Sequence, residues 1–286
     1  MKRLTRIILL IIPVLFCTSW GFFAHQQINY LAIFALPGDM LHFYKKHYNF
    51  IREHAVDPDK RRYTDPKEAP RHYIDIEDYE SSIDSIPEKW AMAVKKYGEN
   101  FLGEHGSVPW HIEKTYYQLV KAFQERDSRL ILKHSANLGH YIADAHVPLH
   151  TSNNHDGQRT GQQGLHAFWE SRVPELFAKD YHLMGVKAHY IAQPLQAAWQ
   201  IIRQSHQAAD SVIRFEAQLN REFPPDQKYA YSRRNKLVAK QYSFAYAQAY
   251  QEKLDGMVEK RMRQAIQMVA SFWYSAWVDA GQPLLP

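Results

Sequence analysis

Apolar residues recur three and four positions apart through most of the chain, which is the spacing of an amphipathic helix. The pattern is clearest in four segments, at 110–123, 128–147, 195–223 and 242–277. In the last segment a single apolar stripe follows the predicted helix, formed by Met262, Ile266, Val269, Trp273 and Trp277. Such a stripe is typical of core packing, so we expect it to face the interior of the protein.

No alternating apolar and polar run with hairpin turn chemistry accompanies these segments. No repeat, low-complexity tract or change of composition divides residues 20–286, and the longest turn-rich stretches are 57–70 and 151–164. The chain has 286 residues, of which 45% are hydrophobic, and this is enough for one large core. The sequence therefore predicts an all-α fold in a single domain.

The first nineteen residues have the three parts of an export signal. Three basic residues within the first six positions precede the ten-residue apolar run 7–16, and small residues follow before Trp20. Ten apolar residues are too few to span a bilayer as a helix. We therefore expect residues 1–19 to be a cleaved signal peptide of an exported, periplasmic or extracellular protein. An uncleaved interfacial anchor and a lipid-modified Cys17 are the alternatives.

Charge and cysteine content depend on this cleavage. The signal segment contains three cations and no acidic residue, so its removal lowers the net charge from +5 to +2. This small surplus gives no support for a protein that binds nucleic acid through a concentrated basic face. The single cysteine is also removed, which leaves no disulfide. Histidine is unusually frequent, with 16 copies, five of them between positions 140 and 166.

His140 and Asp144 are four residues apart in a predicted helix and therefore share one face. An isolated pair of this kind is ordinarily a surface ion pair. The neighbours of this pair are mostly apolar, however, and a carboxylate in such surroundings needs a compensating charge. Pro148 ends the helix and His150 follows just beyond it, free to point back at the same place. The segment therefore favours a metal site.

His166 and Glu170 repeat the spacing after the polar loop 151–164. Together with His150, the two pairs offer imidazole and carboxylate ligands without thiolates. This set is typical of a hydrolytic zinc site that keeps an open position. Two unrelated ion pairs and a helix-cap histidine are the alternative. His146 lies on the other face of its helix, so we expect it to support the fold or the ligands.

Five short motifs follow one another between residues 20 and 170. They are Trp20-Gly21-Phe22-Phe23-Ala24-His25, Ala55-Val56-Asp57, Arg71-His72-Tyr73-Ile74-Asp75, the string from His140 to His150, and Leu165-His166-Ala167-Phe168-Trp169-Glu170. Their composition and order resemble the superfamily that joins zinc-dependent phospholipase C with the single-strand-specific nucleases. Residues 171–286 resemble it only in their helical character.

The resemblance implies a helical phosphodiesterase domain over residues 20–286 with three zinc ions. Asp57, His72, His140 and Asp144 would hold the first ion, His150, His166 and Glu170 the second, and the Trp20 amino and carbonyl groups, His25 and the shared Asp144 the third. An α-amino group has an ordinary pKa of about 8, so a metal displaces its proton more readily than that of a lysine.

The resemblance further implies that metal-activated water hydrolyses a phosphodiester. Asp57 is the expected catalytic residue that orients or deprotonates the water. Lys60, Arg61 and Tyr73 are the expected substrate-binding residues. For the two cations, solvated surface positions are the alternative.

The expected substrate is a phospholipid or another small phosphodiester, in the manner of phospholipase C, and single-stranded nucleic acid is the alternative. The glutamate at position 170 resembles the phospholipases, whereas the nucleases tend to have aspartate there. The polar loop also lacks the Asp-Arg-Gly-Gly-Asn string of the fungal nucleases. The short five-residue spacing between Trp20 and His25 instead resembles the nucleases, since bacterial phospholipases have a longer segment there. A secreted zinc-binding module without catalysis would lack a ligand, and all nine expected positions are filled.

Overall fold

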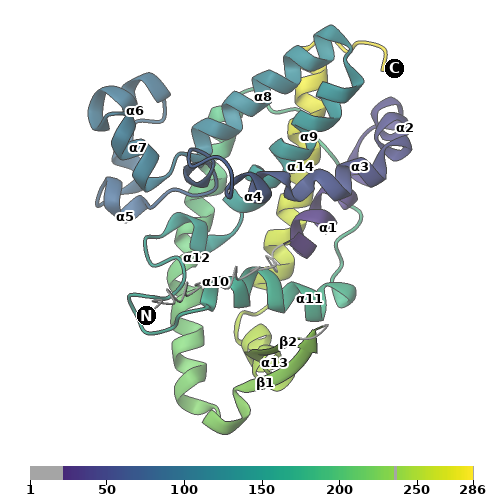
Figure 1. Ribbon diagram of the computed structural model, residues 1–286. Helices are drawn as coiled ribbons and strands as arrows, with labels where there is room; N and C mark the ends of the chain where they lie inside the picture. Colours follow the sequence, from purple (N-terminus) through teal and green to yellow (C-terminus); the bar gives the residue numbers. More distant parts are fainter. Residues whose placement is uncertain (1–21, 235–236, 286) are drawn as a thin grey trace, which may run out of the picture.

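The computed structural model describes residues 22–234 and 237–285, and helices make up most of this part of the chain (Figure 1). Its centre is formed by four long helices: α8 (Val108–Glu125), α9 (Ser128–Ala145), α12 (Pro194–Glu222) and α14 (Met257–Asp279). Helix α8 packs against the other three, and α9 also contacts α12 and α14. The all-α prediction is confirmed.

Shorter helices surround this centre. They are α1 (Phe22–Ala32), α2 (Gly38–Lys46), α3 (Tyr48–Glu53), α4 (Asp57–Arg61), α5 (Ile76–Tyr79), α6 (Trp90–Tyr97), α7 (Glu99–His105), α10 (Leu165–Ala167), α11 (Val173–Phe177) and α13 (Phe244–Lys253). A 3-10 turn at Pro148–Thr151 and a π-helical turn at Phe168–Arg172 carry further polar residues. None of the described helices is long and apolar enough to cross a bilayer.

The predicted helical segments 110–123, 128–147 and 195–223 correspond to α8, α9 and α12. The prediction of one helix over 242–277 is wrong, because the chain turns at Gly256, where φ is +72°, and this turn separates α13 from α14. The apolar stripe of α14 does face the core. Its Trp273 ring stacks on Tyr44 at 4.9 Å, and its indole N–H donates to the Ser135 carbonyl oxygen at 3.0 Å.

A two-stranded antiparallel hairpin, which the sequence pattern did not predict, joins α12 to α13. Strand β1 (Tyr229–Arg234) pairs with β2 (Leu237–Tyr242). Tyrosine and charged residues occupy many positions of its strands, so a search for alternating apolar and polar residues does not reveal the hairpin. In Figure 1 the hairpin lies beside α13 at the end of the molecule below α11.

Helix α1 approaches α9 closely at Gly139. A Cβ atom at this position would lie 2.1 Å from Oδ1 of Asn29, so any larger residue would displace the Asn29 side chain. The Asn29 amide donates to the Ala136 carbonyl oxygen at 3.0 Å and fixes the contact. Asp127 starts α9 by accepting a hydrogen bond from the Leu130 N–H. This packing brings the first turn of α1 next to the polar face of α9.

Candidate metal centre

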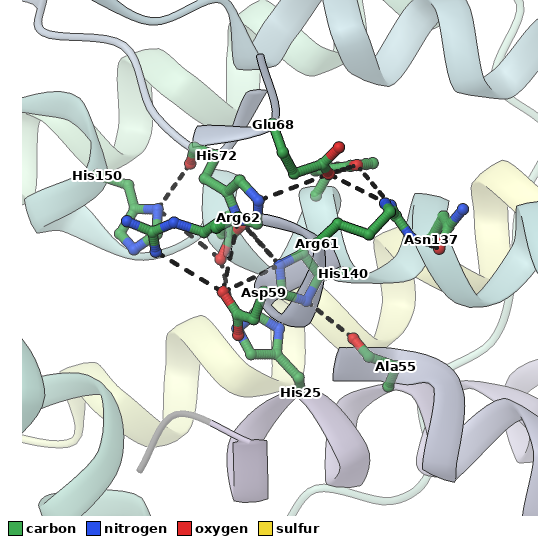
Figure 2. Close-up of polar contacts among 12 residues, drawn as sticks. His25, Ala55, Asp59, Arg61, Arg62, Glu68, His72, Asn137, His140 and His150 are labelled. Carbon is green, nitrogen blue, oxygen red and sulfur yellow. Dashed lines mark hydrogen bonds and ion pairs between the residues drawn. The ribbon is translucent and has the colours of Figure 1, made fainter. Parts of the chain in front are cut away.

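Histidines and carboxylates from seven elements of the chain converge beside α9, and Figure 2 shows several of them. Helix α1 supplies His25, α9 supplies His140 and Asp144, and the segment before α5 supplies His72. The remaining groups are Asp59 on α4, His150 in the 3-10 turn, His166 on α10 and Glu170 in the π-helical turn. Most of these side chains are buried, so their polar atoms need partners.

The first group of convergent ligand atoms belongs to Asp59, His72 and His140, all within 4.8 Å of one another. Oδ1 of Asp59 lies 3.8 Å from both His72 Nδ1 and His140 Nε2. The two imidazole nitrogens are 3.1 Å apart. Since a nitrogen–nitrogen contact can hold only one proton, at least one lone pair points into the group.

Asp57 does not join this group, and this corrects the expectation from sequence. Its Oδ2 lies 2.5 Å from His54 Nδ1, and its Oδ1 accepts a hydrogen bond from Lys60 at 3.1 Å. Residues two apart on a helix are about 200° apart around its axis, so Asp57 and Asp59 point to opposite sides of α4. Asp59 is therefore the aspartate of this helix that lies near His72 and His140.

The second group consists of His150, His166 and Glu170, whose ligand atoms again lie within 4.8 Å of one another, and their role as metal ligands stays a prediction. Nε2 of His150 and Nε2 of His166 face each other at 3.0 Å. Oε2 of Glu170 lies 2.6 Å from His166 Nε2 and 3.4 Å from His150 Nε2.

The third group joins His25 to His140 and Asp144. Nε2 of His25 lies 3.3 Å from Asp144 Oδ1 and 3.2 Å from Glu170 Oε1, and its ring stacks on that of His140. Trp20, the other expected ligand here, lies outside the described residues, as does Cys17.

Asp144 lies between the groups. Its Oδ1 faces His25, while its Oδ2 lies 2.9 Å from His72 Nδ1 and 3.2 Å from His140 Nε2. This geometry suits a carboxylate that bridges two metal ions. Burial alone would raise the pKa of Asp144, but the neighbouring His140 and His150 hold that pKa well below its ordinary value.

Backbone carbonyls orient two of the histidines. Nδ1 of His140 lies 2.8 Å from the Ala55 oxygen, and Nδ1 of His150 lies 2.7 Å from the His72 oxygen. A carbonyl only accepts, so each Nδ1 carries the proton in the neutral ring and each Nε2 presents a lone pair. The Nε2 atoms are the ones that face the first and second groups.

Glu68, which sequence reasoning missed, supports His72 from behind. Its buried Oε1 lies 3.7 Å from His72 Nε2 and accepts hydrogen bonds from Tyr141 and Arg61. Its Oε2 accepts from Arg71 at 2.5 Å. Burial raises the pKa of Glu68, but the nearby His72 and the hydrogen bonds from Tyr141 and Arg61 outweigh it and keep the pKa far below its ordinary value. Glu68 is therefore an ionised carboxylate behind a ligand histidine, a common arrangement in metal sites.

The three groups fit zinc by their chemistry. They contain neutral imidazole and carboxylate donors, and no thiolate. Burial lowers the pKa of His72 and His140, but Asp144 and other acidic neighbours outweigh it and raise both values. Without a cation, protons must balance this much buried negative charge; a divalent metal could replace them.

The three expected substrate-binding residues have different surroundings in the structure. Lys60 is exposed and paired with Asp57, whereas Arg61 turns inward to Glu68, Tyr141 and Asn137. The Tyr73 hydroxyl donates to the Glu104 carbonyl oxygen at 2.9 Å. The next cation, Arg62, was not predicted: its half-exposed guanidinium lies 3.8 Å from Asp59 Oδ1, and Figure 2 shows both residues.

A helical fold that brings histidine and carboxylate side chains together in this way is suited to holding metal ions. The sequence model of the S1/P1 nuclease family matches residues 20–271, which include every described ligand. The chain belongs to this family, whose members are zinc-dependent phosphodiester hydrolases and are typically secreted. No individually curated protein matches the chain.

Proposed function

We propose that this protein is an exported nuclease that cleaves phosphodiester bonds of single-stranded nucleic acid with the help of three zinc ions. The observation that carries the proposal is the convergence of three ligand groups around Asp144 in a chain of the S1/P1 nuclease family. Residues 1–19 act as the signal peptide, and residues 20–286 form the catalytic domain.

The proposed ligand set changes the expected one at a single position. Asp59 replaces Asp57 beside His72 and His140, because of these two aspartates only Asp59 has an oxygen near both imidazoles. His150, His166 and Glu170 hold the second ion. His25 and Asp144 hold the third, together with the amino terminus of Trp20, which lies outside the described residues.

Bound zinc supplies Lewis acidity for the phosphate and lowers the pKa of water. Asp59 is the candidate group that orients the attacking water, because its Oδ1 faces the imidazoles of His72 and His140 and its side chain is only 13% exposed. Arg62 supplies a positive charge for the phosphate at the exposed edge of the groups. Arg61 acts indirectly, since it holds Glu68 ionised behind His72.

Family membership favours nucleic acid over the phospholipid that Glu170 and the polar loop suggested. The length of the Trp20 to His25 step agrees with the nucleases. A glutamate in place of aspartate lengthens one ligand and leaves the donor atoms the same, so it carries little information about the substrate.

The test compares substrates with one preparation of the mature protein. Single-stranded DNA, double-stranded DNA and phosphatidylcholine vesicles are incubated with zinc-loaded protein, with chelated protein, and with chelated protein after zinc is restored. We expect cleavage of the single strand, much slower cleavage of the duplex and no release of phosphocholine. Chelation should abolish cleavage and zinc should restore it. Release of phosphocholine without DNA cleavage would overturn the proposal.

A further inference from the structure

We propose that the β1–β2 hairpin is an accessory binding arm that holds single-stranded nucleic acid outside the metal centre. The arm is defined here as residues 228–242 without 235–236. This inference rests on the proposed function and extends it, since it concerns how a long strand is held and not how it is cleaved.

The arm stands out by its charge. The residues of the arm include four lysines and arginines and no acidic residue. The chain after removal of the first nineteen residues has a net charge of only +2, so this is a local concentration of positive charge. A polyanion is the complementary partner.

One face of the arm also presents tyrosine rings beside an ammonium group. Tyr231 is 75% exposed and lies directly opposite Lys240 in the pairing of the two strands. Nζ of Lys240 lies 3.8 Å from the centre of the Tyr229 ring. Residues paired across the strands share a face, so these three side chains line the same side of the hairpin. Rings next to cations match the alternation of base and phosphate along a single strand.

The arm is anchored firmly at its base. The Lys228 ammonium donates to Glu216 at 3.1 Å and to Asn220 at 2.6 Å, and it lies 5.0 Å from the centre of the Tyr246 ring. Tyr246 also donates to the buried Glu216. A lysine that is already paired with a buried carboxylate serves as a fixed attachment and not as a phosphate ligand.

The same base is connected to the metal centre. Tyr242, the last residue of β2, stacks on Phe168 with ring centres 3.9 Å apart, and Phe168 belongs to the same π-helical turn as Glu170. Gln162, in the loop before His166, donates to Glu216 at 2.6 Å. A strand held by the arm would thus be positioned relative to the ligands of the second group.

A lipid surface is the other partner that exposed tyrosines and lysines could serve. The observations favour nucleic acid, because the rings are ordered beside cations by strand pairing. The exposed face also carries polar hydroxyls and charge more than aliphatic side chains. Membrane binding is therefore treated as an outcome of the test.

The experiment uses zinc-loaded mature protein and the double variant Tyr231→Ala/Lys240→Ala. The matched control is Tyr117→Ala/Lys121→Ala, an exposed tyrosine and lysine on α8. Binding of a fluorescent oligothymidylate with phosphorothioate linkages is followed by anisotropy over a range of salt concentrations. Hydrolysis of a long single strand and of bis(p-nitrophenyl) phosphate is measured in parallel, as is binding to vesicles that contain anionic lipid.

We expect the arm variant to bind the oligonucleotide about five-fold or more weakly, because it loses a stacking ring. Its salt dependence should fall by about 0.7 in log–log slope for the lost cation. KM for the long strand should rise, while kcat/KM for the small diester stays unchanged. The control variant should behave as the unmodified protein.

Equal binding of the oligonucleotide by both variants, or no binding by the unmodified protein, would overturn the proposal that the hairpin is a binding arm. It would also be overturned if the arm variant lost binding to vesicles with anionic lipid but kept oligonucleotide binding. Failure of the proposed function looks different. In that case no strand is cleaved by zinc-loaded protein, whatever the binding result.

Discussion

The carboxylate of Glu68 lies 3.7 Å behind Nε2 of His72, whose Nδ1 faces Asp144 at 2.9 Å on the other side of the ring. The imidazole therefore connects a buried, ionised acid to the ligand groups. Such a carboxylate fixes the ring orientation and makes the histidine a stronger ligand.

Glu68→Gln should weaken zinc binding by about 10- to 100-fold, because the neutral amide keeps the shape but loses the charge. Zinc retained during dialysis against a graded series of chelator concentrations measures this. Glu77→Gln is the control, since Glu77 is hydrogen-bonded to Ser152 and touches none of the proposed ligands. Equal zinc retention by the two variants would show that Glu68 serves only the fold.

The variants Asp59→Asn and Asp57→Asn test which of the two aspartates of α4 belongs to the metal site. The first should lower the zinc content and reduce DNA cleavage by about 100-fold or more, because it removes a charged ligand. The second loses only half-exposed pairs with His54 and Lys60, whose contribution to stability is about 1 kcal/mol or less. Zinc analysis and initial rates decide between them, and the reverse order of effects would restore Asp57 to the site.

The choice between Asp57 and Asp59 could not be made from the sequence, although other parts of the site could be predicted. His140 and Asp144, or His166 and Glu170, are placed together by helix spacing alone, and the structure brings both pairs into the ligand groups. In Asp57-Pro58-Asp59 two acids compete, and the direction of each depends on where a five-residue helix begins. Spacing does not determine that.

Other features depend on distant contacts. Glu68 stands in a polar stretch with no periodic pattern, and its burial results from Arg61, Arg71 and Tyr141 closing around it. The long helices were predictable because their apolar periodicity extends over many turns. The hairpin was not, because tyrosines and cations occupy its strands and its stability comes from packing on α13 and Phe168.

Asp75 should make stability depend on pH. Burial and the nearby charge of Asp78 raise the pKa of its carboxyl to about 7, above the ordinary value of about 3.9. The folded protein thus holds this proton more tightly than the unfolded chain. The resulting stabilisation is complete below pH of about 4 and is lost as the pH rises through about 7.

Asp75→Asn removes this dependence. Relative to the unmodified protein, the variant should gain thermal stability as the pH is raised from about 5 to about 8, which melting curves at several pH values will show. Asp210→Asn, at an exposed aspartate, is the control and should follow the unmodified protein. Parallel curves for all three proteins would contradict the raised pKa.

The proposed role of Trp20 predicts a link between export and activity. One extra residue before Trp20 converts its amine into an amide, which is neither basic nor well placed to chelate. A cytoplasmic protein that begins Met-Trp20 should fold, keep about two zinc ions and lose most of its cleavage rate. N-terminal mass spectrometry, zinc analysis and rates on the exported and cytoplasmic forms test this. Full activity with three zinc ions in a confirmed Met-Trp form would remove the N-terminus from the ligand set.

Reconstitution with zinc tests the central claim most directly. The exported, mature protein is freed of metal and titrated with zinc while bound metal and cleavage of single-stranded DNA are followed together. We predict no cleavage by the metal-free protein and full activity only as about three ions bind, with weaker binding in acid because imidazole must be neutral to bind zinc. Cleavage without metal, or full activity with one ion or none bound, would contradict the account.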